Sequence, residues 1–162
     1  MCSGNRVHRA FPLPAHHGPT PLSDRIRLSV ENEPDGLTRD TIESGLEAYN
    51  VAKAGPDPSE PVWIVARDGR AVVGGLKGGA LWTWFYVDWL WVSEPERGRG
   101  LGSRLLQAAE ESARVQGCTG LYLNTFSFQA PEFYRRHGFA EFGRLEDFPP
   151  GHARIWMRKT LA

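Results

Sequence analysis

The feature that most constrains the fold is a glycine-rich stretch between an apolar run and an amphipathic helix. The run ends at Val92, three glycines follow at Gly98, Gly100 and Gly102, and residues 101–116 repeat apolar side chains at every fourth position. A helix start carries unpaired backbone N–H groups and the positive end of the helix dipole. Glycines leave that backbone bare, so the stretch predicts a strand–loop–helix unit that binds an anion, most often phosphate.

Spacing excludes two nucleotide-binding motifs in this stretch. A P-loop ends in Gly-Lys-Ser/Thr, whereas Gly102 is followed directly by Ser103 with no lysine. A dinucleotide fingerprint that starts at Gly98 needs glycine at position 103, and one that starts at Gly100 needs glycine in place of Leu105. The pattern that remains is Arg97-x-x-Gly100-x-Gly102.

Hydrophobic periodicity predicts one α/β (α+β) domain over residues 25–162, after a flexible lead at residues 1–24 that mixes Pro, Gly, His and Ser. A turn is expected at Asp68-Gly69, and the aromatic run "LWTWFYVDWLWV" is expected to form one long central strand. The predicted helices are 35–52, 101–116 and 130–137, and the predicted strands are 26–30, 62–67, 71–78, 81–92, 119–126, 139–145 and 153–161.

The bulk composition narrows the partners and the compartment. The formal net charge is zero, so no overall field attracts nucleic acid or an anionic membrane. There is no secretory or long apolar segment, and Cys2 and Cys118 match no metal spacing. We expect a cytoplasmic protein without a metal, in which Cys118 is a buried, inert thiol and the pair His16-His17 binds nothing.

Two motifs together carry a resemblance to a known family. The pattern Arg97-x-x-Gly100-x-Gly102 follows a strand and opens a helix, and "APEFYRRHGF" places Tyr134 on a short helix before Gly-Phe. From Val62 to Leu161 the chain resembles the GNAT N-acetyltransferase superfamily. The resemblance implies a single domain with a central, mixed, mostly antiparallel twisted sheet, splayed central strands and flanking helices, and it implies acetyl-CoA as the acetyl donor.

The resemblance also implies roles for particular residues. Tyr134 stands where the family places its general acid, and Ser127 stands where the family often has asparagine, for which Asn124 is a candidate substitute. The residues implied to bind acetyl-CoA are Leu90, Val92, Arg97, Gly98, Arg99, Gly100, Leu101, Gly102, Ser103, Asn124 and Ser127.

An alkylamine acceptor must lose a proton before it attacks, because its pKa is roughly 10. Asp88 is the candidate base, since alternation along a strand would put it on one face with Tyr86, Leu90 and Val92, at the thioester end. A structural ion pair of Asp88 is an equally open interpretation. Weaker candidates are Glu94 and Glu132.

The acceptor is less constrained. Trp82, Trp84 and Tyr86 alternate and would either wall a cation pocket or belong to the core. The segments "FSFQA" and "EDFPPGHAR" resemble those of small family members with undefined acceptors, and the helix that ends in "EAYN" borders the acceptor site by the same resemblance.

Three functions are consistent with these features. The leading hypothesis is acetylation of a primary amine on a small molecule by direct attack within a ternary complex. The alternatives are a non-catalytic acyl-CoA-binding regulatory module and an N-acetyltransferase of proteins or peptides, although no charged run marks a peptide track. A homodimer is compatible with the family.

Overall fold

A computed structural model describes residues 25–57 and 60–161 of the chain. The predicted flexible lead at residues 1–24, with Cys2, His16 and His17, lies outside the described residues, so its boundary with the domain stays a prediction. The chain divides into two units, Met1–Leu46 and Glu47–Ala162, and each unit is described on its own.

Helix α1 (Gly36–Ala54) confirms the helix predicted over residues 35–52. It follows Asp35, whose side-chain carboxylate accepts a hydrogen bond from the backbone N–H of Thr38 at 2.7 Å. This bond satisfies one of the unpaired donors at the helix start and lowers the pKa of Asp35.

The strand predicted over residues 26–30 was wrong. This segment carries no strand structure, and it forms no ladder with any described strand. An alternating pattern such as "IRLSV" becomes a strand only where a neighbour pairs with its backbone. The apolar side chains here include Leu28, which is 93% exposed.

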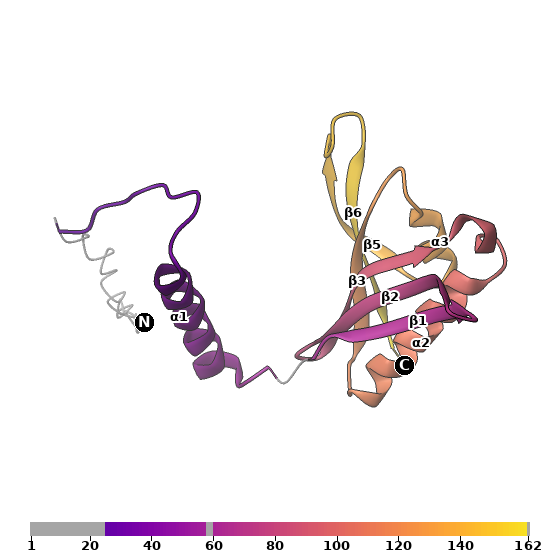
Figure 1. Cartoon of the computed structure of the whole chain (residues 1–162), viewed down its shortest axis with the longest axis horizontal. Coiled ribbons are helices and arrows are strands. Elements are labelled where there is room, and N and C mark those ends of the chain that lie inside the picture. The colour runs from indigo at the N-terminus through magenta and orange to yellow at the C-terminus, as the bar shows by residue number, and fades with distance from the viewer. Residues whose placement is uncertain (1–24, 58–59, 162) are drawn as a thin grey trace, which may run out of the picture. The chain divides into compact units, whose positions relative to one another are not determined.

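The sheet confirms the predicted mixed, mostly antiparallel architecture (Figure 1). Its six strands are ordered β1-β2-β3-β4-β6-β5; the β3–β4 pair is parallel and the other pairs are antiparallel. The strands are β1 (Val62–Asp68), β2 (Ala71–Leu81), β3 (Trp84–Val92), β4 (Gly120–Phe126), β5 (Ala140–Glu146) and β6 (Ala153–Thr160).

The long central strand predicted over residues 81–92 was wrong at its start. Leu81 ends β2 and pairs with Trp84, the first residue of β3, so that Trp82 and Thr83 form a two-residue turn. Trp82 has a positive φ of 48°, which bulky residues rarely adopt. Trp82 therefore does not share a strand with Trp84 and Tyr86, and the aromatic run concealed a hairpin because it lacks glycine, proline or asparagine.

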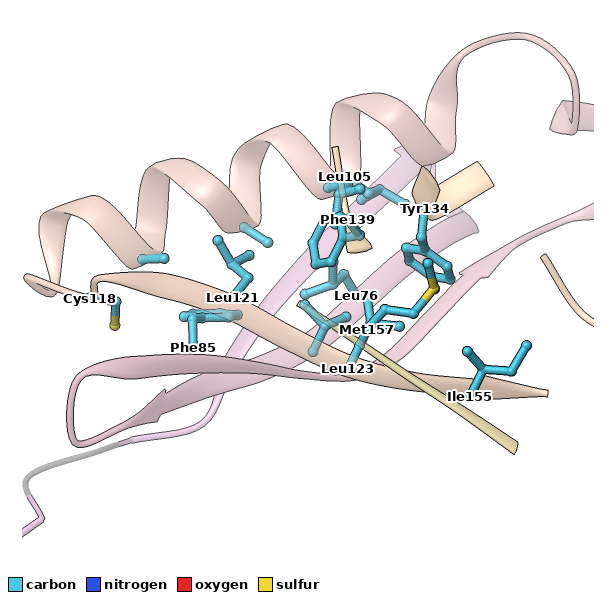
Figure 2. Packing of buried hydrophobic residues seen from close by; sticks show 14 of the residues in the cluster. Leu76, Phe85, Leu105, Cys118, Leu121, Leu123, Tyr134, Phe139, Ile155 and Met157 are labelled. Atoms are coloured by element: carbon cyan, nitrogen blue, oxygen red, sulfur yellow. The ribbon is translucent and has the colours of Figure 1, made fainter. Parts of the chain in front are cut away.

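The core lies between the sheet and α2 (Leu101–Val115), with the short helix α3 (Pro131–Arg136) contributing Tyr134 (Figure 2). The four-residue apolar repeat predicted for α2 is the buried stripe. The buried cluster is Leu76, Phe85, Val87, Leu105, Leu106, Ala109, Ala113, Cys118, Leu121, Leu123, Tyr134, Phe139, Ala153, Ile155 and Met157.

Cys118 is buried at the end of α2, which confirms the predicted buried thiol. Burial raises the pKa of this thiol, so the reactive thiolate form is disfavoured. Within the part of the chain that the structure describes, no helix has the length and apolar character needed to cross a membrane.

Candidate active site

A β-bulge in β3 determines which side chains reach the site. Val87 pairs with Gly78 and Trp89 pairs with Lys77, so Asp88 is an extra residue with no partner on β2. A bulge of this kind inserts one residue and shifts the alternation of side chains along the strand.

The predicted shared face of Tyr86, Asp88, Leu90 and Val92 was therefore wrong. Val87 points into the core before the bulge, and Leu90 and Val92 pack against the core after it. Tyr86 lies on the opposite face of the sheet, the one that α2 does not cover. The rule that successive side chains point to opposite faces failed here, because no residue type in the sequence predicts the bulge.

The central strands separate beyond the bulge, as the resemblance implied. Parallel pairing between β3 and β4 ends at Val87 and Leu123, after which β3 pairs only with β2 and β4 only with β6. A cleft of about 840 Å³ occupies this region. It is lined by Val87, Asp88, Trp89, Leu90, Trp91, Val92, Glu96, Arg97, Gly98, Gly100, Gly102, Ser103, Asn124, Thr125, Phe128, Gln129, Ala130, Phe133, Tyr134, Arg136 and His137.

The glycine stretch forms one wall of the cleft. Gly98 and Gly100 have positive φ of 72° and 87°, and Gly100 is the N-cap of α2. The first helical hydrogen bond runs from Arg104 N–H to the Gly100 carbonyl, at 3.1 Å. None of the N–H groups of residues 98–103 donates to another described group. A Cβ at Gly98 or Gly100 would meet nothing within 4 Å, and both glycines line the cleft.

The two arginines of the stretch differ. Arg97 lines the cleft and donates from Nε to the Val92 carbonyl at 3.1 Å, which ties the loop to the end of β3. Arg99 lies outside the cleft lining, and its Nη1 is 3.4 Å from a carboxylate oxygen of Glu96. Leu101 also lies outside the lining and packs against the core.

His137 joins α3 to the start of α2. Its Nδ1 is 2.8 Å from the carbonyl oxygen of Phe133, and its Nε2 is 2.9 Å from Ser103 Oγ. Because a carbonyl only accepts, Nδ1 carries the proton, and in the neutral ring Nε2 accepts from the Ser103 hydroxyl. This link fixes Ser103 at the mouth of the glycine stretch.

Tyr134 reaches the cleft from α3. Its ring packs edge-on against Phe133 and Phe139, with centroids 5.1 Å and 5.9 Å away. The hydroxyl has no hydrogen-bond partner among the described residues. Burial raises the pKa of Tyr134 to about 12, so the hydroxyl keeps its proton throughout the neutral range and acts as a donor.

Asp88 forms an ion pair, as one of its two interpretations expected, and its role as a base stays a prediction. It lines the cleft, and its carboxylate also accepts a hydrogen bond from Lys77 Nζ at 2.8 Å. The same Nζ lies 4.5 Å from the ring centroid of Trp89. The weaker candidates Glu94 and Glu132 do not line the cleft, and Glu132 pairs with Arg135.

The two candidate amide and hydroxyl ligands are placed differently. Ser127 lies outside the cleft lining, and its Oγ accepts from Ala153 N–H at 3.0 Å, next to β6. Asn124 lines the cleft, donates to the Tyr86 hydroxyl oxygen at 2.7 Å and accepts from Arg154 Nε at 2.8 Å. The structure thus brings Asn124, and not Ser127, to the cleft.

Sequence reasoning missed several lining residues. Phe133, Arg136 and His137 lie inside the quoted segment "APEFYRRHGF", which contains the six-residue helix α3. That segment could have indicated that they line the cleft. Phe128 and Gln129 lie inside the quoted segment "FSFQA", whereas Thr125 gave no comparable signal. Gln129 is held by accepting from the Phe126 N–H at 2.9 Å and from the Thr125 hydroxyl at 3.1 Å.

Among the described residues, no group of three or more His, Cys, Asp or Glu side chains is placed to hold a metal ion. The site consists of backbone N–H groups that can bind an anion, the hydroxyl of a mostly buried tyrosine and a carboxylate, all around one cleft. Bare N–H groups fit a phosphate, and the separated strands leave unpaired backbone along β3 for an extended ligand.

The model of the Acetyltransferase (GNAT) family matches residues 28–139, and the chain belongs to this family. It is therefore an acetyltransferase of a family that uses acetyl-CoA as donor. An acetyltransferase of Agrobacterium fabrum is 37% identical over 128 residues, 78% of this chain and 93% of the relative.

Two further proteins are similar to this chain. Blasticidin-S acetyltransferase of Streptomyces morookaense is 48% identical over 91 residues, which cover 56% of this chain and 67% of the relative. A crystal structure of an acetyltransferase from Bacillus cereus matches with a TM-score of 0.76 and 34% identity, covering 82% of this chain and 98% of that one. The structural match thus agrees with the family assignment.

Proposed function

We propose that the protein transfers the acetyl group of acetyl-CoA to a primary amine of a small molecule, by direct attack within a ternary complex. The glycine stretch and the Asp88 carboxylate line the same cleft, which supports a site that binds donor and acceptor together. The relative named for blasticidin-S supports a small-molecule acceptor, since its own name gives one.

The donor binds through backbone groups. The N–H groups of residues 98–103, that of Ser103 included, hold the pyrophosphate, and Arg97 supplies positive charge. The pantetheine arm lies along the unpaired edge of β3 at Leu90 to Val92, where β4 has turned away. Asn124 supplies an amide on the opposite wall.

The reaction needs one proton removed and one proton delivered. The amine nitrogen attacks the acetyl carbonyl carbon, an N–C bond forms, and the C–S bond of the thioester breaks. Asp88 accepts the proton that the amine loses. Tyr134 donates its hydroxyl proton to the departing sulfur. The proton that Asp88 accepted then returns to the Tyr134 oxygen through water in the cleft, so that both residues regain their starting protonation states.

One observation carries the proposal: bare backbone donors and an unpartnered tyrosine hydroxyl open into the same cleft. The test is a thiol-release assay with acetyl-CoA and separate panels of polyamines, aminoglycosides, amino acids and short peptides. Mass spectrometry of each amine identifies the N-acetylated product. We expect release of coenzyme A to depend on a small-molecule amine.

The assay separates the three hypotheses. Acetylation confined to peptides supports an N-acetyltransferase of proteins or peptides. Tight binding of acetyl-CoA by calorimetry with no acetylation of any amine or peptide supports a binding module. Acetylation of a hydroxyl instead of an amine contradicts the proposed acceptor class.

A further inference from the structure

The two segments with no assigned role meet in space. "FSFQA" supplies Phe126 and Phe128 at the end of β4, and "EDFPPGHAR" supplies Phe148 and His152 before β6. The rings of Phe126 and Phe128 stack at 5.2 Å, Phe148 packs edge-on against Phe126 at 6.1 Å, and His152 packs edge-on against Phe128 at 4.9 Å. The segments therefore build one aromatic cluster.

Arg154 is the charged residue of this cluster. Its Cζ lies 5.2 Å from the Phe126 ring, 5.6 Å from the Phe148 ring and 5.7 Å from the Trp156 ring. Three rings around one guanidinium restrict its orientation and remove part of its water shell. A partly desolvated guanidinium binds an anion more strongly than one in open water.

The guanidinium is held by one edge only. Nε donates to Asn124 Oδ1 at 2.8 Å, which fixes the plane of the fork. Across residues 25–57 and 60–161, no carboxylate forms an ion pair with Arg154, although eight ion pairs involve other side chains. The N–H groups of the two terminal Nη atoms have no acceptor among the described residues. Their spacing matches that of the two oxygens of a carboxylate.

Arg154 lies next to residues that line the cleft, which relates its guanidinium to the acceptor. Asn124, which orients Arg154, lines the donor cleft, and Phe128 of the same aromatic cluster lines it too. A group bound by Arg154 therefore lies beside the cleft that holds Tyr134 and Asp88.

We infer that Arg154 binds a carboxylate on the acceptor, so that the substrate class is an amine carrying a carboxylate beside an apolar or aromatic group. This inference rests on the proposed function, which it makes more specific. The fork sets the distance of the amine from the thioester, and the rings of Phe126, Phe148 and Trp156 contact the apolar part.

The test is calorimetric titration of the full chain, saturated with coenzyme A, with phenylacetate, phenylacetamide and benzylphosphonate. We expect phenylacetate to bind at least about tenfold more tightly than the amide, which lacks the charge. Arg154→Gln removes this preference. Arg158→Gln is the matched control, since Arg158 lies on the same strand over the Phe142 ring and keeps the preference.

Each outcome decides the inference. Equal binding of acid and amide by the wild type, undetectable binding of phenylacetate, or an unchanged preference in Arg154→Gln overturns it. Tighter binding of benzylphosphonate assigns the fork to phosphate instead. The wild-type comparison stands even where Arg154→Gln fails to fold. Acetyl transfer is measured separately, so an active enzyme without carboxylate preference refutes this inference and retains the proposed function.

Discussion

The proposed donor side and the proposed acceptor side of the cleft consist of different chemical groups. On the proposed donor side, the groups are backbone N–H groups of residues 98–103, which donate to no other described group. On the proposed acceptor side, the polar groups are side chains: Asp88 and Asn124 line the cleft, Lys77 pairs with Asp88, and Arg154 donates to Asn124. A backbone site is disrupted by adding atoms, whereas a side-chain site is disrupted by changing the chemistry of atoms already there.

The largest expected effect is on the donor side, from Gly100→Asp. Because Gly100 lines the cleft and a Cβ there meets no other atom within 4 Å, the new carboxylate would lie beside the proposed phosphate site and repel the pyrophosphate. We expect binding of coenzyme A to fall beyond detection by calorimetry.

Gly69→Asp is the matched control. Gly69 also has a positive φ, of 55°, and its added Cβ also meets nothing within 4 Å, so the same substitution is made at a second positive-φ glycine in open space. This variant is expected to bind coenzyme A like the wild type. If Gly100→Asp is folded and binds as tightly as Gly69→Asp, the backbone site is misassigned.

Tyr134→Phe tests the point where the two sides meet. Removing a general acid lowers kcat by roughly a hundredfold to ten-thousandfold. Acetyl-CoA binding should persist, because the ring keeps its packing against Phe133 and Phe139. Tyr122→Phe, on β4 outside the cleft lining, removes a hydroxyl without this loss. Equal kcat values for the two variants would remove Tyr134 from the chemistry.

Asp88→Asn tests the acceptor side, with Lys77→Met as its partner. If Asp88 accepts the amine proton, the first variant lowers kcat by roughly tenfold to a hundredfold, and the second leaves the carboxylate in place. If the pair is only structural, both variants lose the same small free energy of unfolding and kcat changes alike. Steady-state kinetics and urea unfolding of both variants separate the two roles.

Much of the cleft lining around the glycine stretch was predictable, because it comes from residues that are neighbours in the sequence. Glycines at a strand–helix junction state the backbone conformation directly, and eight of the implied donor residues line the cleft: Leu90, Val92, Arg97, Gly98, Gly100, Gly102, Ser103 and Asn124. Arg99, Leu101 and Ser127 do not, since the helix start turns Leu101 into the core and β6 engages Ser127.

The acceptor side was not predictable to the same depth, because it depends on register. The bulge at Asp88 and the hairpin at Trp82 each shifted the faces along the aromatic run, and neither has a sequence signal of its own. The contact between Asn124 and Arg154 joins positions 30 residues apart through the β4–β6 ladder. Only the paired strands place such residues together.

The smallest expected effect comes from the burial of Tyr134 and appears at high pH. Its pKa is raised from 10 in the unfolded chain to about 12 in the fold, so the protonated form stabilises the fold fully below pH 10. That contribution is lost as the pH rises from 10 toward 12, since ionisation then favours the unfolded chain. At pH 11 the loss is about 1 kcal/mol. Urea unfolding should show the wild type losing this much relative to Tyr134→Phe between pH 8 and pH 11. Parallel curves for the two proteins would mean that the fold does not raise the pKa of Tyr134.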